Sequence, residues 1–159
     1  MMDLQNAKKH WVIRKYKDAE SFRAGLPFEV SEFDGNLMLN EGIAVEAALL
    51  TGGAGTPYSN ANAHLGVGDS AAAESATQTG LQGTNTAFAP MDTGFPTITG
   101  QTIRWQAIFD GNTANFAWNE FTITNAADDT GDNLNRKVSA QGTKTAGQIW
   151  TLYIDITFS

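Results

Sequence analysis

Alternating apolar and polar residues mark the last third of the chain as β-strands. In 150–158, large apolar side chains occupy every second position from Trp150 to Phe158. The same period of two occurs in 102–109, where aliphatic and aromatic residues share one face. A half-buried strand has this period because successive side chains point to opposite faces of the sheet. We therefore predict two strands here, and we expect the one at 150–158 to be central in its sheet.

The middle of the chain, from about 26 to 100, alternates short apolar stretches with segments rich in Gly, Ala, Ser and Thr. The apolar stretches at 43–50 and 64–68 predict strands that end in Gly-containing loops. At most one helical turn is expected, at 71–76, because Ser and Thr weaken the helical pattern there. The Gly and Pro content of 92–96 predicts a turn.

The clearest turn signal follows the strand at 102–109. Asp110-Gly111-Asn112 contains the Asp-Gly pair favoured in hairpins. In the next predicted strand, 116–124, the apolar residues change face near Glu120, which indicates a β-bulge or burial on both faces. Several strands separated by turns, with little helix, predict an all-β fold. We expect an antiparallel β-sandwich or a jelly-roll-like barrel over residues 26–159.

Residues 1–25 precede this domain and fit neither the helical nor the strand period. They mix basic side chains with aromatic and aliphatic ones. We predict an extended N-terminal arm that orders against the body or a neighbouring molecule, with a short helix around 15–23. Trp11 and Tyr16 are its predicted anchors, because aromatic residues dominate interface energetics. The predicted partner-binding residues of the arm are Lys8, Lys9, Trp11, Arg14, Lys15 and Tyr16.

Composition strengthens the β prediction. Charged residues make up 17% of the chain, below the roughly 25% of an average globular protein. Thr, Asn, Ser, Gln and 16 Gly take their place, whereas exposed helix faces need Glu, Lys and Arg. The absence of cysteine excludes disulfides and thiolate metal sites. No apolar run reaches the roughly 18 residues of a membrane span, and no signal-peptide pattern is present, so we expect a soluble protein made in the cytoplasm.

The net charge of −7 is unevenly distributed along the chain. Residues 1–23 hold six of the ten Lys and Arg against three acids, giving +3, and residues 24–159 carry −10. The acidic body should repel nucleic acid and anionic membranes. For the basic segment we favour a solvated arm or a contact with an acidic partner protein over binding of DNA or RNA.

Candidate catalytic residues are sparse. A nucleophilic triad needs a histidine base, and the chain has only His10, in the basic segment, and His64, in a short predicted strand. The Gly-x-Ser-x-Gly elbow, the P-loop and the dinucleotide-binding glycine pattern are all missing. A glycosidase-type pair of carboxylates is defined by spatial separation, and the sequence nominates none. We expect no enzymatic activity and no cofactor.

Two charged features are interpreted as structural. The acidic run at 128–133 superficially suggests a calcium loop, but the glutamate and flanking helices of an EF-hand are missing, so we predict a solvated turn. Glu120 and Arg136 are predicted to form a structural ion pair, since arginine binds carboxylates with well-defined geometry. We favour this interpretation over a catalytic role for either residue.

Short pieces between 63 and 158 follow one another in a characteristic order. They include His64–Ser70, Ala114–Glu120, Leu134–Val138, Gly142–Thr145 and the terminal strand, with Leu81–Gly83 and Met91–Pro96 between the first two. This order resembles structural proteins of tailed-bacteriophage particles, in which a Val-Gly strand precedes an Asn-rich hairpin, a Leu-Asn-Arg segment and a Gly-Thr-Lys turn. Such proteins form β-sandwich modules on the particle surface. The basic N-terminal segment lies outside the resemblance.

The resemblance implies a virion protein that binds the outside of an assembled capsid as a decoration (cement) subunit and stabilises the shell. Its partner would be the major capsid protein, and a homotrimer would match a threefold position of the shell. The alternative is a tail-fibre or collar module that binds a host receptor or glycan through Tyr58, Trp118 and Trp150. Both imply synthesis in the host cytoplasm, localisation on the virion and no membrane association.

Overall fold

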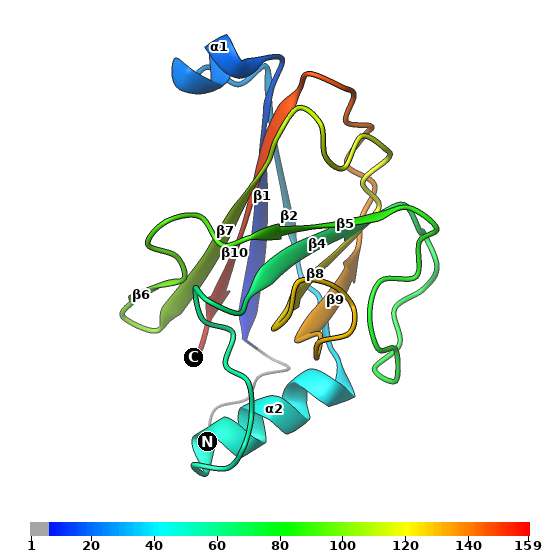
Figure 1. The fold of residues 1–159 in the computed structure, drawn as a ribbon. Helices are drawn as coiled ribbons and strands as arrows, with labels where there is room; N and C mark the ends of the chain where they lie inside the picture. The colour runs from blue at the N-terminus through cyan, green and yellow to red at the C-terminus, as the bar shows by residue number, and fades with distance from the viewer. Residues whose placement is uncertain (1–6) are drawn as a thin grey trace.

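The computed structural model describes residues 7–159, whose strands form two five-stranded antiparallel sheets packed against each other (Figure 1). The first sheet contains β1 (Lys8–Tyr16), β2 (Glu29–Asp34), β6 (Thr97–Thr99), β7 (Thr102–Phe109) and β10 (Ile149–Thr157) in the order β2-β1-β10-β7-β6. The second contains β3 (Leu37–Met38), β4 (His64–Gly68), β5 (Thr86–Pro90), β8 (Glu120–Thr124) and β9 (Asn135–Val138) in the order β3-β9-β8-β4-β5. The predicted antiparallel β-sandwich is confirmed.

Two helices lie at opposite ends of the sandwich, α1 (Ala19–Arg23) within the β1–β2 connection and α2 (Asn40–Leu50) across the other end (Figure 1). Helix α1 confirms the short helix expected around 15–23. Neither of these helices of the described chain is long and apolar enough to cross a membrane.

Strand β10 occupies the centre of the first sheet, as its alternation predicts. It pairs with β1 on one side and with β7 on the other, so that Trp11 and Trp105 both lie opposite Ile154. The core between the sheets is rich in aromatic rings. Trp118 packs edge-to-face against Phe109 and Trp150, with ring centroids 4.9 and 4.8 Å apart. Such pairs stabilise a core beyond the area that they bury.

The segment predicted as an arm is instead an interior strand of the sandwich. Strand β1 pairs with β10 along its whole length and with β2 from His10 to Lys15, so a domain boundary at residue 25 would divide one sheet. Trp11, Val12 and Ile13 are all buried, Trp11 and Ile13 in the core. The strand lacks simple alternation because both of its faces are partly covered, which explains why the sequence pattern did not reveal it.

The stretch at 43–50, predicted as a strand, belongs to helix α2. Its Ala, Leu and Glu residues have high helix propensity, which here outweighs the strand-like apolar run. Gly42 allows α2 to approach the second sheet closely, since a Cβ at this position would lie 2.5 Å from the Cα of Leu134. The helical turn expected at 71–76 does not form, and this segment is irregular.

The Asp110-Gly111-Asn112 turn does not close a hairpin. Strands β7 and β8 belong to different sheets, and the chain between them crosses from one sheet to the other. The strand expected from residue 116 begins only at Glu120. All five residues of β8 are buried, which confirms the expectation of burial on both faces.

Because Trp11 is fully buried, we expect Trp11→Ala to lower the free energy of unfolding by about 3–5 kcal/mol, as large aromatic-to-Ala changes in cores do. Lys8→Ala, on the exposed side of the same strand, should change it by less than about 0.5 kcal/mol. Urea denaturation followed by circular dichroism measures both. Equal, small effects would mean that β1 is a detachable arm after all.

Candidate functional site

The six residues predicted to bind a partner through an arm lie on both faces of β1 and do not form one surface. Lys9, Trp11 and Lys15 are buried, whereas Lys8 and Arg14 are exposed. Tyr16 is buried and packs edge-to-face against Phe22. The ring of Trp11 contacts those of Phe33 and Phe121 in the core, so it cannot anchor a partner, and that prediction is corrected.

Lys15 shows what a buried cation does in this structure. Its Nζ donates a hydrogen bond to the carbonyl oxygen of Gln141 (2.6 Å) and forms an ion pair with Glu29. The hydrogen bond from Lys15 holds the pKa of Glu29 below its usual value. The ammonium also lies 4.7 Å from the ring centroid of Trp150, a cation–π contact. Lys15 thus ties an irregular segment near Gln141 to the first sheet.

The predicted contact between Glu120 and Arg136 is confirmed, and both side chains are 0% exposed. Arg136 Nε donates to Glu120 Oε2 at 2.8 Å, and Nη2 lies at the same distance from that oxygen without hydrogen-bond geometry. Glu120 Oε1 and Arg136 Nη1 form hydrogen bonds with the neighbouring loop. Removing one partner of such a buried pair would leave an uncompensated charge in the interior, which is strongly destabilising.

This pair holds the loop of residues 69–85 against the outer face of the second sheet. Glu120 accepts hydrogen bonds from the backbone N–H groups of Gln82 (2.9 Å) and Gly83 (2.7 Å). Arg136 Nη1 donates to the carbonyl oxygen of Ala72 (3.0 Å) and to Gln78 Oε1 (3.1 Å). A Cβ at Gly83 would lie 2.8 Å from Glu120 Oε1, so glycine is needed for the loop to approach the carboxylate.

Lys144 holds the segment that crosses between the sheets, as Glu120 and Arg136 hold the loop 69–85. Its Nζ is buried and donates to the carbonyl oxygens of Asp110 (2.5 Å) and Thr113 (2.8 Å) and to Asn115 Oδ1 (2.8 Å). Burial lowers the pKa of the Lys144 ammonium. The lysine of the Gly-Thr-Lys piece therefore has a structural role, which the sequence did not indicate.

Three of the exposed large apolar residues in the described part of the chain lie within five positions of one another, and we call them the 26–30 patch. Its members are Leu26 (69% exposed), Phe28 (53% exposed) and Val30 (47% exposed). They lie at alternate positions along a stretch that runs from α1 into β2. Phe28 N–H donates to the carbonyl oxygen of Lys15 (2.8 Å), which extends the pairing of β1 and β2 beyond the strand itself.

The surroundings of the 26–30 patch favour a contact with another protein. Strand β2 is the last strand of its sheet, so one of its edges is unpaired and can accept another chain. Beside it, Leu26 and Phe28 line a hollow of about 430 Å³ with polar residues of the α1 region, among them Lys17 and Glu20. A clustered apolar surface with a polar rim is typical of interaction sites.

The two histidines and the acidic loop have local partners. His10 Nδ1 lies 2.7 Å from Asp34 Oδ1 and lowers the pKa of Asp34, and His64 Nδ1 lies 3.2 Å from the carbonyl oxygen of Asn62. Neither described histidine contact involves a serine or threonine hydroxyl. In the run 128–133, Thr130 donates its N–H and hydroxyl to Asp128 Oδ1, which is turn geometry.

Tyr58, Trp118 and Trp150, the aromatic residues expected to bind a glycan, are all buried. Trp118 and Trp150 belong to the core, and the Tyr58 hydroxyl donates to the carbonyl oxygen of Asp132 (3.1 Å). These three residues therefore do not form an exposed sugar-binding surface, which corrects that expectation.

Comparisons of the chain with protein-family models, with curated proteins and with solved structures give no match. The description of the protein thus rests on its own geometry. That geometry defines a β-sandwich in which buried charges hold irregular segments and the 26–30 patch is exposed.

Breaking the buried pair tests its structural role. We expect Arg136→Met to lower the free energy of unfolding by about 3–5 kcal/mol, because Glu120 would remain buried without its counter-charge. Arg104→Met is the matched control, since Arg104 pairs with Asp155 at 2.7 Å but is partly exposed. Its loss should cost about 1 kcal/mol. Chemical denaturation of the two variants compares them, and equal losses would contradict a special role for the buried pair.

Proposed function

We propose that this chain is a non-enzymatic structural protein of a tailed-bacteriophage particle that binds the outside of the assembled capsid as a decoration subunit. Two features support the proposal. The order of motifs between 63 and 158 resembles that of phage particle proteins. The 26–30 patch supplies an apolar contact surface, and it is the observation that carries the proposed interaction.

The proposed contact works by burial of apolar area. Fully burying a side chain such as Leu, Phe or Val contributes about 1.5–3 kcal/mol each, so the three residues of the patch can anchor a small interface. Lys15 pairs with Glu29, and Phe28 N–H donates to the carbonyl oxygen of Lys15, so the stretch that carries the patch is held against β1, and a preorganised surface loses less entropy on binding. The major capsid protein is the proposed partner.

The proposed stabilisation of the shell follows from the linkage between binding and assembly. A subunit that binds only the assembled shell shifts the equilibrium toward assembly, and its effect grows with concentration. We propose a homotrimer at a threefold position, because three copies of the 26–30 patch would then engage the shell together and gain avidity. The protein would be made in the host cytoplasm and reside on the capsid surface, with the net acidic body toward solvent.

The tail-fibre or collar alternative has less support. Its candidate glycan-binding residues, Tyr58, Trp118 and Trp150, are buried. We therefore retain the decoration function as the proposal.

Co-sedimentation with capsids stripped of accessory subunits tests the proposal. We expect saturable binding at a fixed ratio to the shell protein, and at least tenfold weaker binding by the Leu26→Ser/Phe28→Ser variant, since tenfold corresponds to about 1.4 kcal/mol. Leu50→Ser is the matched control, because Leu50 is 71% exposed but lies on α2 at the other end of the molecule. It should bind like the wild type.

The mass of the free and the bound protein tests the proposed trimer in the same experiment. Lack of co-sedimentation by the wild type would contradict the proposed function. If Leu50→Ser weakened capsid binding as much as the double variant does, the assignment of the contact to the 26–30 patch would be wrong.

A further inference from the structure

A second hollow lies on the first sheet, at the edge opposite the 26–30 patch. The patch runs into β2 at one end of the strand order, and β6 forms the other end. The volume of the hollow is about 490 Å³, within the range of small-molecule sites. Its lining comes from β6, β7, β10 and the loop before β6, and consists of Phe95, Thr97, Thr99, Thr102, Arg104 and Asp155.

The strand pairing places the polar side chains of this hollow in two neighbouring rows. Arg104 lies opposite Thr97 on β6 and opposite Asp155 on β10. Thr102, two residues earlier on β7 and therefore on the same face, lies opposite Thr99. The residues of β7 that face the core alternate with these two, so both rows belong to the outer face of the sheet.

Arg104 and Asp155 form a fixed pair of hydrogen-bond donors and acceptors. Arg104 Nε and Nη2 donate to the two carboxylate oxygens of Asp155, each at 2.7 Å, and Cζ lies 4.0 Å from the ring centroid of Tyr153. These contacts hold the planar guanidinium in one orientation. Its third nitrogen, Nη1, bonds to no residue among 7–159. Since the two side chains are 38% and 19% exposed, the pair can still donate to a ligand and accept from it.

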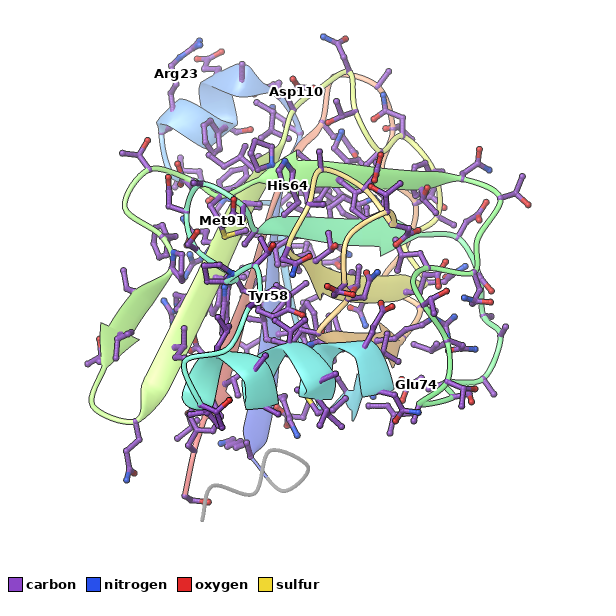
Figure 2. The ribbon with its side chains drawn as sticks, turned by 60° about the horizontal axis from the view of Figure 1, so that its bottom comes forward. Arg23, Tyr58, His64, Glu74, Met91 and Asp110 are labelled. Carbon is purple, nitrogen blue, oxygen red and sulfur yellow. The ribbon has the colours of Figure 1, made fainter. Side chains whose placement is uncertain are left out.

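Phe95 is held beside the polar rows by the loop that joins β5 to β6. Figure 2 labels Met91, where this loop begins. Phe95 N–H donates to the carbonyl oxygen of Asp92 (3.1 Å), and Asn60 Nδ2 donates to that of Phe95 (2.6 Å). The Asp92 carboxylate in turn accepts from Gln106 Nε2 on β7 (3.1 Å). The backbone that carries this half-buried ring is therefore fixed against the sheet before any ligand arrives.

The charges that line the hollow cancel. Arg104 and Asp155 have opposite charges, and the remaining lining residues are threonines and one phenylalanine. An anionic ligand would compete with Asp155 for the guanidinium, and a cationic ligand would compete with Arg104 for the carboxylate. A neutral ligand can bond to both groups without breaking their pair. Each threonine hydroxyl adds a donor and an acceptor.

We propose that this hollow binds a neutral pyranose sugar. Hydroxyl groups of the sugar donate to Asp155 and accept from Arg104 Nη1, and further hydroxyls bond to the threonines. The apolar C–H face of the pyranose ring packs against Phe95. This inference goes beyond the proposed capsid function and does not depend on it, because the 26–30 patch lies at the other edge of the sheet and stays free to contact a shell.

Titration of the ¹⁵N-labelled protein with the methyl glycosides of glucose, galactose, mannose and N-acetylglucosamine, followed by NMR, tests the proposal. We expect saturable shifts of the amides of Thr97, Thr99 and Arg104 with at least one glycoside, with a dissociation constant of about 1–10 mM. Sodium sulfate should give no saturable shifts at these positions, because Asp155 already neutralises Arg104. Saturation by sulfate in place of the sugars would make the hollow an anion site and overturn the proposal.

Two variants of the hollow and one control assign the binding to its residues. Arg104→Met loses the donors and Phe95→Ala loses the ring, so each should bind the sugar at least tenfold more weakly. Arg14→Met is the matched control, since Arg14 also lies near Tyr153, with Cζ 5.6 Å from the ring centroid, but outside the hollow. Its affinity should match that of the wild type.

The spectrum of each variant shows in the same experiment whether its fold is retained. No saturable shift with any glycoside up to about 100 mM would overturn the proposal, as would wild-type affinity in either folded variant of the hollow.

Discussion

Burial of the Glu120–Arg136 pair is the constraint on which much of this structure depends. Both groups are removed from water, and the loop 69–85 supplies hydrogen-bond partners to the carboxylate and to Arg136 Nη1 that the sheet does not. The loop in turn depends on the Glu120–Arg136 pair. The loop has no helix or strand of its own, and several of its backbone groups bond to the pair rather than to a neighbouring strand.

Lys15 and Lys144 extend the same principle to other irregular segments. Each places a buried ammonium where it donates to backbone carbonyl oxygens, Lys15 near Gln141 and Lys144 in the crossing segment after β7. A low-charge chain thus uses several of its ten basic residues internally. The cations that remain exposed on β1, such as Arg14, are too few to make the basic arm that the charge distribution suggested. The surface that we propose as the contact with a partner is apolar instead, in the 26–30 patch.

The sequence predicted those parts of the fold in which one face is buried and the other is polar. Strands β7 and β10 have a clean period of two, and they were found where expected. Strand β1 was missed because both faces are covered, and its basic residues suggested solvent exposure although Lys9 and Lys15 are buried. The stretch that became α2 has an apolar run typical of a strand, but its Ala, Leu and Glu residues favour the helix that forms. The 26–30 patch was not predicted, since exposure of alternate apolar residues depends on which edge of the sheet stays open.

Hydrogen exchange of the backbone amides of Gln82 and Gly83 tests the central claim most directly, because these amides donate to Glu120 from an otherwise irregular loop. If the buried pair fixes the loop, both amides exchange about as slowly as that of Ile123 in β8, and Arg136→Met makes them exchange rapidly. Rapid exchange in the wild type, with Ile123 still protected, would show that the loop opens independently of the sheet and would contradict the account.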